Sequence, residues 1–259
     1  MNFVVCIKQV PGTTNIKIDP KTNTLVREGV QSIINPFDCY AIEESVRLRE
    51  KCGGKVTVIT MGPPQADAAL REAISLGADE AVLISDRAFA GSDTWATSYV
   101  LSKAIQKLGK CDVIICGKQT LDGDTGQVGP GIAETLQVPF VAYVSKIEEI
   151  KDGCMRCTRM IEEGHETIES SLPAVITVTK EINVPRIPSI RGTMKSKSAK
   201  ITVWTATDIG VEAEKAGLNG SPTRVVKIFF PKRERKSEML KGNSGEQVDQ
   251  LIKKLEGII

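Results

Sequence analysis

The sequence predicts an α/β fold with a mostly parallel sheet covered by helices on both faces. Through the first 144 residues, short continuous apolar runs alternate with amphipathic segments, which is typical of buried parallel strands joined by helices. A glycine-rich turn follows one of these runs and opens the next helical pattern. With 259 residues and 41% hydrophobic content, the chain can bury a substantial core. These observations predict a Rossmann-like α/β/α domain.

The elements of this domain are expected in regular alternation. Residues 3–8, 56–61, 81–85, 112–116 and 140–144 are the expected strands, and residues 38–51, 64–76, 94–108 and 126–136 the expected helices. Ligands of such sheets bind beyond the carboxyl ends of the strands, where the strand order reverses. The segments expected at that edge are residues 8–14, 35–36, 60–64 and 117–125.

The pattern changes after residue 145. Shorter alternating runs at residues 146–150, 155–161, 166–170 and 174–179 are punctuated by Gly153 and Gly164, which predicts antiparallel hairpins added to the sheet. Beyond residue 182 the periodicity weakens, prolines interrupt the chain, and an amphipathic helix is expected only at 248–255. The predicted organisation is a core of residues 1–182 and an extended arm of residues 183–259 that wraps another subunit.

Charge is unevenly distributed along the chain. The net charge is +2, but residues 180–259 hold 16 Lys and Arg against 9 Asp and Glu, while residues 1–179 hold 18 against 23. Aromatic residues make up only 4%, too few for a base-stacking platform, so nucleic acid is not an expected partner. A basic arm against an acidic protein partner is the better interpretation.

Several further classes of protein are disfavoured by composition. No apolar run approaches the roughly 20 residues that cross a bilayer, and the first residues lead into a strand without a signal-peptide pattern. Seven cysteines, several of them inside apolar runs, indicate a cytoplasmic chain without a disulfide framework. Cys154 and Cys157 form a C-x-x-C pair, but on a strand they would face opposite sides, so no metal site is expected.

The glycine-rich turn is the strongest functional signal. It spans residues 117–130, directly after the apolar run 113–116, with Gly123, Gly126 and Gly129 at every third position. Glycines let the backbone approach an anion, and the following helix directs a positive end at the same place. The spacing matches neither the Gly-x-Gly-x-x-Gly of dinucleotide dehydrogenases nor a P-loop. A plain strand-to-helix connection is the alternative.

This turn predicts particular contacts. The amides of Asp124, Thr125, Gln127 and Val128 are expected to bind phosphate, with the side chains of Thr125 and Gln127 as further donors. Asp122 and Asp124 suit ribose hydroxyls, or caps for a helix that begins near Thr125.

Five motifs in order resemble the β subunit of electron-transfer flavoproteins. They are residues 4–11, Ile34-Asn35-Pro36-Phe37-Asp38, Met61-Gly62-Pro63 with Gly77-Ala78-Asp79, the turn 117–129, and the hairpin 159–168 followed by 172–177. Residues 24–33 resemble a segment inserted in electron-bifurcating members. The chain departs from the family pattern at Cys157 and at Phe37, where Asp is usual.

The resemblance implies an adenine nucleotide-binding fold and a partner α subunit that carries FAD. In bifurcating members the β subunit holds a second FAD, oxidises NADH, and sends electrons to ferredoxin or flavodoxin and, through the α subunit, to a flavin dehydrogenase. That dehydrogenase is of the acyl-CoA, enoyl-CoA or 2-hydroxy-acid type. In simpler members the β subunit holds structural AMP, and this remains the main alternative. A nucleotide-sensing α/β module is a weaker one.

The turn and the resemblance together assign the expected site residues. No catalytic side chain is expected. Partner binding is assigned to Ile190, Arg191 and Met194. Cofactor binding is assigned to Cys6, Arg27, Asn35, Asp38, Met61, Gly117, Gln119, Asp122, Gly123, Asp124, Thr125, Gly126, Gln127, Val128 and Gly129, with Asn35 and Asp38 near the adenosine or flavin end and Arg27 as the charge nearest the flavin.

Overall fold

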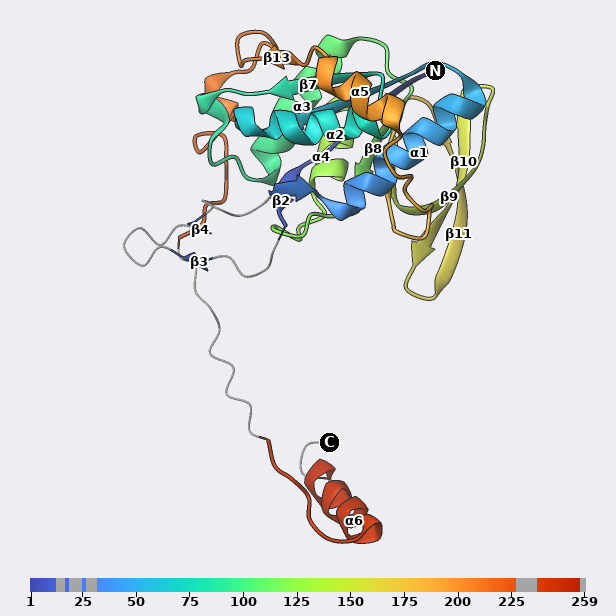
Figure 1. The fold of residues 1–259 in the computed structure, drawn as a ribbon, viewed down its shortest axis with the longest axis vertical. Coiled ribbons are helices and arrows are strands. Elements are labelled where there is room, and N and C mark those ends of the chain that lie inside the picture. The colour runs from blue at the N-terminus through green and yellow to red at the C-terminus, as the bar shows by residue number, and fades with distance from the viewer. Residues whose placement is uncertain (13–16, 19–24, 27–31, 227–236, 257–259) are drawn as a thin grey trace. The chain divides into compact units, whose positions relative to one another are not determined.

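A computed structural model describes residues 1–12, 17–18, 25–26, 32–226 and 237–256 (Figure 1). They belong to two compact units, Met1–Val226 and Lys227–Ile259. Within the described residues, the first unit holds a nine-stranded sheet with the order β11-β10-β9-β12-β8-β1-β6-β7-β13. Its parallel strands are β1 (Asn2–Cys6), β6 (Lys55–Met61), β7 (Glu80–Ile84), β8 (Val113–Gly117), β9 (Phe140–Lys151), β12 (Ala174–Val178) and β13 (Thr202–Trp204).

The strand order reverses at β1. From β1 the chain moves to β6 and β7 on one side, and then returns to β8 on the other side of β1. The carboxyl ends of β1 and β8 therefore form the switch point at which ligands of doubly wound sheets bind. The predicted parallel α/β fold is confirmed.

Two hydrophobic cores cover the two faces of the sheet (Figure 1). Side chains alternate along each strand, so Val5 of β1 packs with α1 (Pro36–Cys52) and α2 (Asp67–Ser75), while Val4 packs with α3 (Thr94–Leu108) and α4 (Val128–Leu136). Short 3-10 turns, η1 (Pro64–Ala66) and η2 (Arg87–Phe89), lead toward α2 and α3.

The hairpin region is partly as predicted. β10 (Cys154–Ile161) and β11 (Gly164–Ser171) pair antiparallel, and β10 pairs antiparallel with β9, which is one strand of 12 residues rather than two. The prediction that residues 174–179 belong to an antiparallel hairpin is wrong. That segment forms β12, which lies parallel between β8 and β9. All five residues of β12 are buried, as expected for an interior parallel strand.

The first unit continues well beyond residue 182, where the arm was expected to begin. α5 (Ile190–Ser198) packs on α2 through Arg71, whose Nη1 donates to the carbonyls of Ser196 at 2.8 Å and Ala199 at 3.1 Å. β13 pairs in parallel register with β7, and a 3-10 turn, η3 (Ala213–Lys215), follows. Residues 183–226 thus pack on the core, and the second unit begins at Lys227. The wrapping of a partner by residues 183–259 stays a prediction.

Short strand pairs occupy the segment before α1. β2 (Gln9–Pro11) pairs with β5 (Ser32–Ile34), and β3 (Lys17–Ile18) pairs with β4 (Leu25–Val26). Arg27 lies outside the described residues. Its predicted role near a flavin therefore stays a prediction.

The described part of the second unit is built around α6 (Ser244–Leu255). A capping box starts this helix: the Asn243 side chain accepts from the Glu246 amide, and the Glu246 side chain accepts from the Asn243 amide, each at 3.0 Å. Val248, Ile252 and Leu255 are exposed. Among all the described helices, none has the length and apolar character needed to span a membrane.

Candidate functional site

A cavity of about 220 Å³ opens at the carboxyl ends of β1 and β8, at the switch point. Its floor contains Cys6 and Cys116, which are in-register neighbours on the two strands, both buried. Hydrogen bonding with Cys116 and burial raise the pKa of the Cys6 thiol well above its usual value. The Cys6 thiol therefore stays neutral, which is compatible with a flat apolar ligand.

Asn35 lies outside the cavity lining and holds two parts of one wall together by hydrogen bonds. Its Nδ2 donates to Asp38 Oδ1 at 3.0 Å and to the carbonyl of Gln119 at 2.9 Å, and its Oδ1 accepts from the amide of Leu121 at 3.1 Å. Asn35 is fully buried and lies outside the cavity lining. It ties the start of α1 to the glycine-rich loop, residues 117–127.

Asp38 lines the cavity and is buried, and its Oδ2 accepts from the amide of Lys8 at 2.7 Å. Burial raises the pKa of Asp38 to about 7, although hydrogen bonds from Asn35 and from the Lys8 and Gly117 amides favour the carboxylate. The carboxyl group therefore titrates close to neutral pH.

We expect Asp38 to give the nucleotide-free protein a distinctive pH dependence. The native carboxyl keeps its proton to higher pH than the unfolded one, so its contribution to the free energy of unfolding falls as the pH rises from about 4 to about 7, by up to about 4 kcal/mol, and is flat above. Urea unfolding across pH 4–8 should show this decline in wild type and not in Asp38→Asn. An unchanged pH profile in Asp38→Asn would contradict this assignment.

The glycine-rich loop takes a shape that exposes backbone donors. Asp124 and Gly126 have positive φ angles of 51° and 62°. The amides of Thr125, Gln127 and Val128 donate to no acceptor within the part of the chain that the structure describes. All three residues line the cavity at the start of α4, which is where an anion site has its donors. The Asp124 amide, by contrast, donates to the carbonyl of Thr120 at 2.9 Å, so its predicted role as a phosphate donor does not fit this loop geometry.

The prediction that Asp122 or Asp124 caps the next helix is wrong. α4 begins at Val128, and Gln127, at its N-cap position, makes no side-chain capping bond. Asp124 instead accepts from Gln119 Nε2, and Asp122 forms an ion pair with Lys8. The positive φ angles of Asp124 and Gly126 keep this segment out of the helix, so residues 125–127 separate Asp124 from the start of α4.

Most predicted cofactor residues meet around this one cavity. Asp122 and Asp124, like Asn35, lie next to it without lining it. The predicted residues in the lining are Cys6, Asp38, Met61, Gly117, Gln119, Gly123, Thr125, Gly126, Gln127, Val128 and Gly129.

A second wall of the cavity is absent from the sequence-based prediction. It is formed by the start of α3, where Asp93 Oδ1 accepts from the amides of Trp95 at 3.0 Å and Ala96 at 3.1 Å. Thr94 Oγ1 then donates to Gln127 Oε1 at 2.8 Å, which joins α3 to the loop. The Asp93-Thr94 pair is an N-cap signal readable from the sequence. The residues that line the cavity but are absent from the predicted site are Ile7, Lys8, Asp93, Thr94, Thr97, Leu101, Cys116, Lys118 and Thr120.

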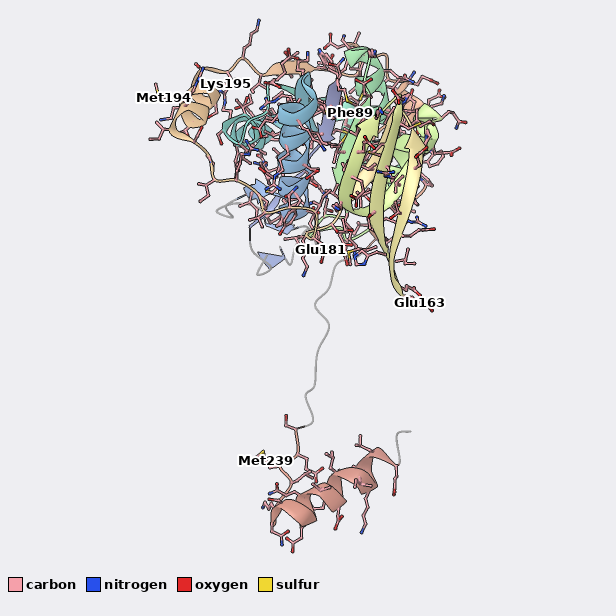
Figure 2. All side chains as sticks on the ribbon, turned by 90° about the vertical axis from the view of Figure 1, so that its right-hand side faces the viewer. Phe89, Glu163, Glu181, Met194, Lys195 and Met239 are labelled. Carbon is pink, nitrogen blue, oxygen red and sulfur yellow. The ribbon has the colours of Figure 1, made fainter. Side chains whose placement is uncertain are left out.

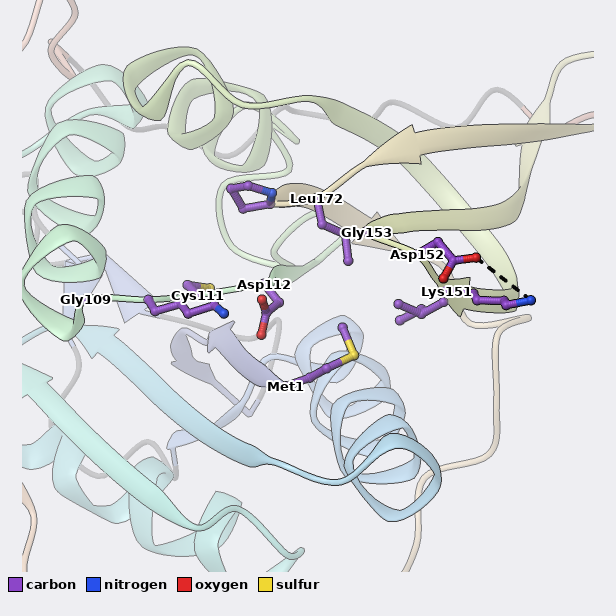
Figure 3. A pocket seen from close by; sticks show the side chains of 11 residues that line it. Met1, Gly109, Cys111, Asp112, Lys151, Asp152, Gly153 and Leu172 are labelled. Atoms are coloured by element: carbon purple, nitrogen blue, oxygen red, sulfur yellow. Dashed lines mark ion pairs between the residues drawn. The ribbon is translucent and has the colours of Figure 1, made fainter.

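A larger cavity, of about 730 Å³, lies at the opposite edge of the sheet (Figure 3). Met1, Cys111 and Asp112 line one side, and Lys151 and Asp152 of the β9–β10 turn line the other. Its carboxylates are already engaged: Asp112 Oδ2 accepts from the Asn2 amide at 2.7 Å, and Asp152 pairs with Lys151 at 3.9 Å. The smaller cavity, with its convergent donors, is the better candidate site.

The segment predicted to bind a partner is exposed. Ile190 is 84% exposed and Met194 68%, and Met194 projects outward from α5 (Figure 2). Arg191 is exposed as well. Ile190 is therefore not covered by other described residues of this chain. Four residues before Ile190, Arg186 connects the segment to α1: its Nε donates to Glu43 Oε2 at 2.8 Å.

The fold is that of a doubly wound α/β protein, and its cavity lies at the switch point of the parallel sheet, where proteins of this class bind their ligands. The family model described as electron transfer flavoprotein domain matches residues 22–209. The electron transfer flavoprotein subunit beta of Thermoanaerobacterium thermosaccharolyticum is 53% identical over 256 residues, 98% of each chain.

Two further relatives are similar to this chain over nearly its whole length. Subunit CarD of the caffeyl-CoA reductase-Etf complex of Acetobacterium woodii is 47% identical over 258 residues, 99% of this chain and 98% of the relative. Protein FixA of Azotobacter vinelandii is 46% identical over 253 residues, 95% and 90% of the two chains. The chain belongs to the electron transfer flavoprotein family, as a β subunit. Its role lies in electron transfer, and β subunits of this family pair with an α subunit.

Proposed function

We propose that this β subunit binds FAD in the cavity at the switch point and takes part in electron bifurcation within a cytoplasmic complex with an α subunit. The observation that carries the proposal is the meeting of the Thr125, Gln127 and Val128 amides with the start of α4 over a cavity floored by Cys6. The resemblance of residues 24–33 to the insert of bifurcating members supports it, as does the similarity to CarD, a subunit of a reductase–Etf complex by name.

The residues present fit an adenine nucleotide. The free amides of the loop and the α4 dipole would hold its phosphate, and the Cys6 floor with Met61 and Leu101 offers apolar surface to a ring. FAD bound here would accept a hydride from NADH and pass single electrons to ferredoxin or flavodoxin and, through the α-subunit FAD, to a partner dehydrogenase.

The size of the cavity limits what this chain encloses by itself. Ligand pockets usually measure about 300–1,000 Å³, and this one measures about 220 Å³. It suits the nucleoside-phosphate half of a dinucleotide, and the remainder of FAD would extend beyond the cavity. Structural AMP fits the same walls, and it is the second candidate ligand for that reason.

Ligand extraction from the purified αβ complex, followed by reaction with NADH, tests the proposal. We expect two FAD per heterodimer, rapid reduction of the complex by NADH, and ferredoxin reduction only when the high-potential acceptor is present. One FAD plus AMP, with no reaction toward NADH, would overturn bifurcation and return the chain to the simple electron-carrier class.

We further propose that Ile190, Arg191 and Met194 dock a flavin dehydrogenase of the acyl-CoA, enoyl-CoA or 2-hydroxy-acid type. An exposed apolar anchor beside cationic side chains has the composition of an interface hot spot with a polar, steering rim.

Ile190→Ala is expected to weaken transfer to the partner dehydrogenase by roughly tenfold in apparent affinity, because a hot-spot anchor contributes about 1.4 kcal/mol or more. FAD content should not change. Val203→Ala, at an exposed apolar residue on β13, is the matched control and should leave transfer intact. If Ile190→Ala loses FAD while partner transfer stays normal, the assignment of this surface is wrong.

A further inference from the structure

An ion pair spans the edge of the candidate site. Lys8 Nζ lies 2.8 Å from Asp122 Oδ1 and 2.7 Å from Asp122 Oδ2. It joins the end of β1 to the middle of the glycine-rich loop. The two side chains are 47% and 29% exposed, so water reaches the pair.

The backbone of Lys8 is fixed while its side chain remains able to move. Its amide donates to buried Asp38 Oδ2 at 2.7 Å, and its carbonyl accepts from the Asn35 amide at 2.9 Å. The flexible four-carbon stem leaves the ammonium group free to exchange one acceptor for another within its reach. Lys8 lines the cavity, whereas Asp122 lies outside the lining.

Among the described residues, each of the two cations in the lining already makes a contact. Its charged members are Lys8, Lys118, Asp38 and Asp93. Lys118 Nζ lies over the ring of Tyr143, 5.0 Å from its centroid, and Lys8 is held by Asp122. A phosphate arriving at the free loop amides therefore gains the Lys8 ammonium only if Lys8 leaves Asp122.

We propose that Lys8 exchanges Asp122 for the phosphate of the bound nucleotide, so that Lys8 favours phosphorylated over unphosphorylated ligands while Asp122 is a built-in competitor that moderates the affinity for phosphate. This inference rests on the proposed function, that the cavity takes an adenine nucleotide. The ion pair between the partly exposed Lys8 and Asp122 side chains stabilises the loop only weakly, because water screens it. A phosphate carries more charge and also engages the loop amides, so it outcompetes the carboxylate, whereas a nucleoside cannot.

Titration of the nucleotide-stripped αβ complex with adenosine, AMP and ADP tests the exchange. In Lys8→Gln, the Kd for AMP should rise about tenfold and the Kd for ADP at least as much, while adenosine binding is unchanged. In Asp122→Asn, the Kd for AMP should fall about threefold, again with adenosine unchanged. In the double variant, loss of Asp122 should bring no further gain, because the two residues act as one unit.

Lys55→Gln is the matched control, since Lys55 pairs with Glu80 at 2.9 Å and is equally exposed, at 47%. It should bind all three ligands as wild type does. Equal losses of adenosine and AMP in Lys8→Gln, or AMP binding in Asp122→Asn no tighter than in wild type, would overturn the exchange. Loss of adenosine binding in Asp122→Asn would assign Asp122 to ribose instead. A wild-type complex that binds none of these nucleotides, nor FAD, would overturn the proposed function itself.

Discussion

Gly117→Ala is expected to lose at least tenfold in affinity for the nucleotide and about 1–3 kcal/mol in the free energy of unfolding. A Cβ at this position would lie 2.3 Å from Asp38 Oδ1 and 2.8 Å from the carbonyl carbon of Phe37. Neither neighbour can yield easily, because Asp38 is buried and hydrogen-bonded and Phe37 lies in the first turn of α1. FAD or AMP content after dialysis and urea unfolding measure the two effects.

Gly123→Ala is the matched control within the same loop. Its added Cβ would meet only Thr120 Oγ1, at 3.5 Å, which is an ordinary contact. The free energy of unfolding should stay within error of wild type. Equal behaviour of the two alanine variants would show that close packing of Gly117 against Asp38 is not what shapes the site.

Arg186→Ala is expected to lower the free energy of unfolding by about 2–3 kcal/mol and to weaken transfer to the partner dehydrogenase. The guanidinium contacts Glu43 Oε2 at 2.8 Å through Nε and Glu50 Oε1 at 2.8 Å through Nη1. The Glu43 side chain is only 4% exposed, and removing one partner of a buried pair leaves an uncompensated charge. Arg47, which also contacts Glu43, limits the loss. The freed segment would no longer hold Ile190 in place.

The same pair predicts an acid dependence. Burial raises the pKa of Glu43, but hydrogen bonds from Arg186 and Arg47 outweigh it and hold the pKa below its usual 4.5. The resulting stability is present above pH 4.5 and is lost as the pH falls through the lower native value. Arg186→Ala should therefore flatten this part of the pH profile.

Arg156→Ala provides the control for Arg186→Ala. Arg156 pairs with Glu149 at 3.5 Å with both side chains about half exposed, so its removal should cost less than about 1 kcal/mol. If Arg186→Ala and Arg156→Ala lower the free energy of unfolding equally, the contact between Arg186 and Glu43 does not stabilise the protein in the way proposed.

The parallel core and the loop were predictable from the sequence because their signals are local. Apolar runs and helical periodicity depend only on neighbouring residues, and α3 spans the same residues, 94–108, as predicted. A glycine-rich turn between a buried strand and a helix likewise indicates an anion site without knowledge of the rest of the fold. Residues 8–14 and 117–125 could be placed at one edge because the carboxyl ends of parallel strands share that edge.

Features that depend on distant partners could not be read in this way. The insertion of β12 between β8 and β9, and the pairing of β13 with β7, are contacts between segments far apart in the chain. α5 looked irregular because its support comes from Arg71 on α2 rather than from its own periodicity. A local pattern reports which face of a strand is apolar but not which strand lies beside it.

The charged contacts of the site also required the tertiary structure. Lys8 and Asp122 are 114 residues apart, and Arg186 and Glu43 are 143 apart. In the sequence, none of these four charged side chains can be distinguished from one that is exposed to solvent. Local patterning thus determined the class of fold and the place of the loop. The tertiary structure decided the partner of each charge: the sheet brings the end of β1 beside the end of β8 for Lys8 and Asp122, and the segment before α5 lies against α1 for Arg186 and Glu43. The physical reason is that electrostatic pairing depends on distance in space and leaves no periodic trace along the chain.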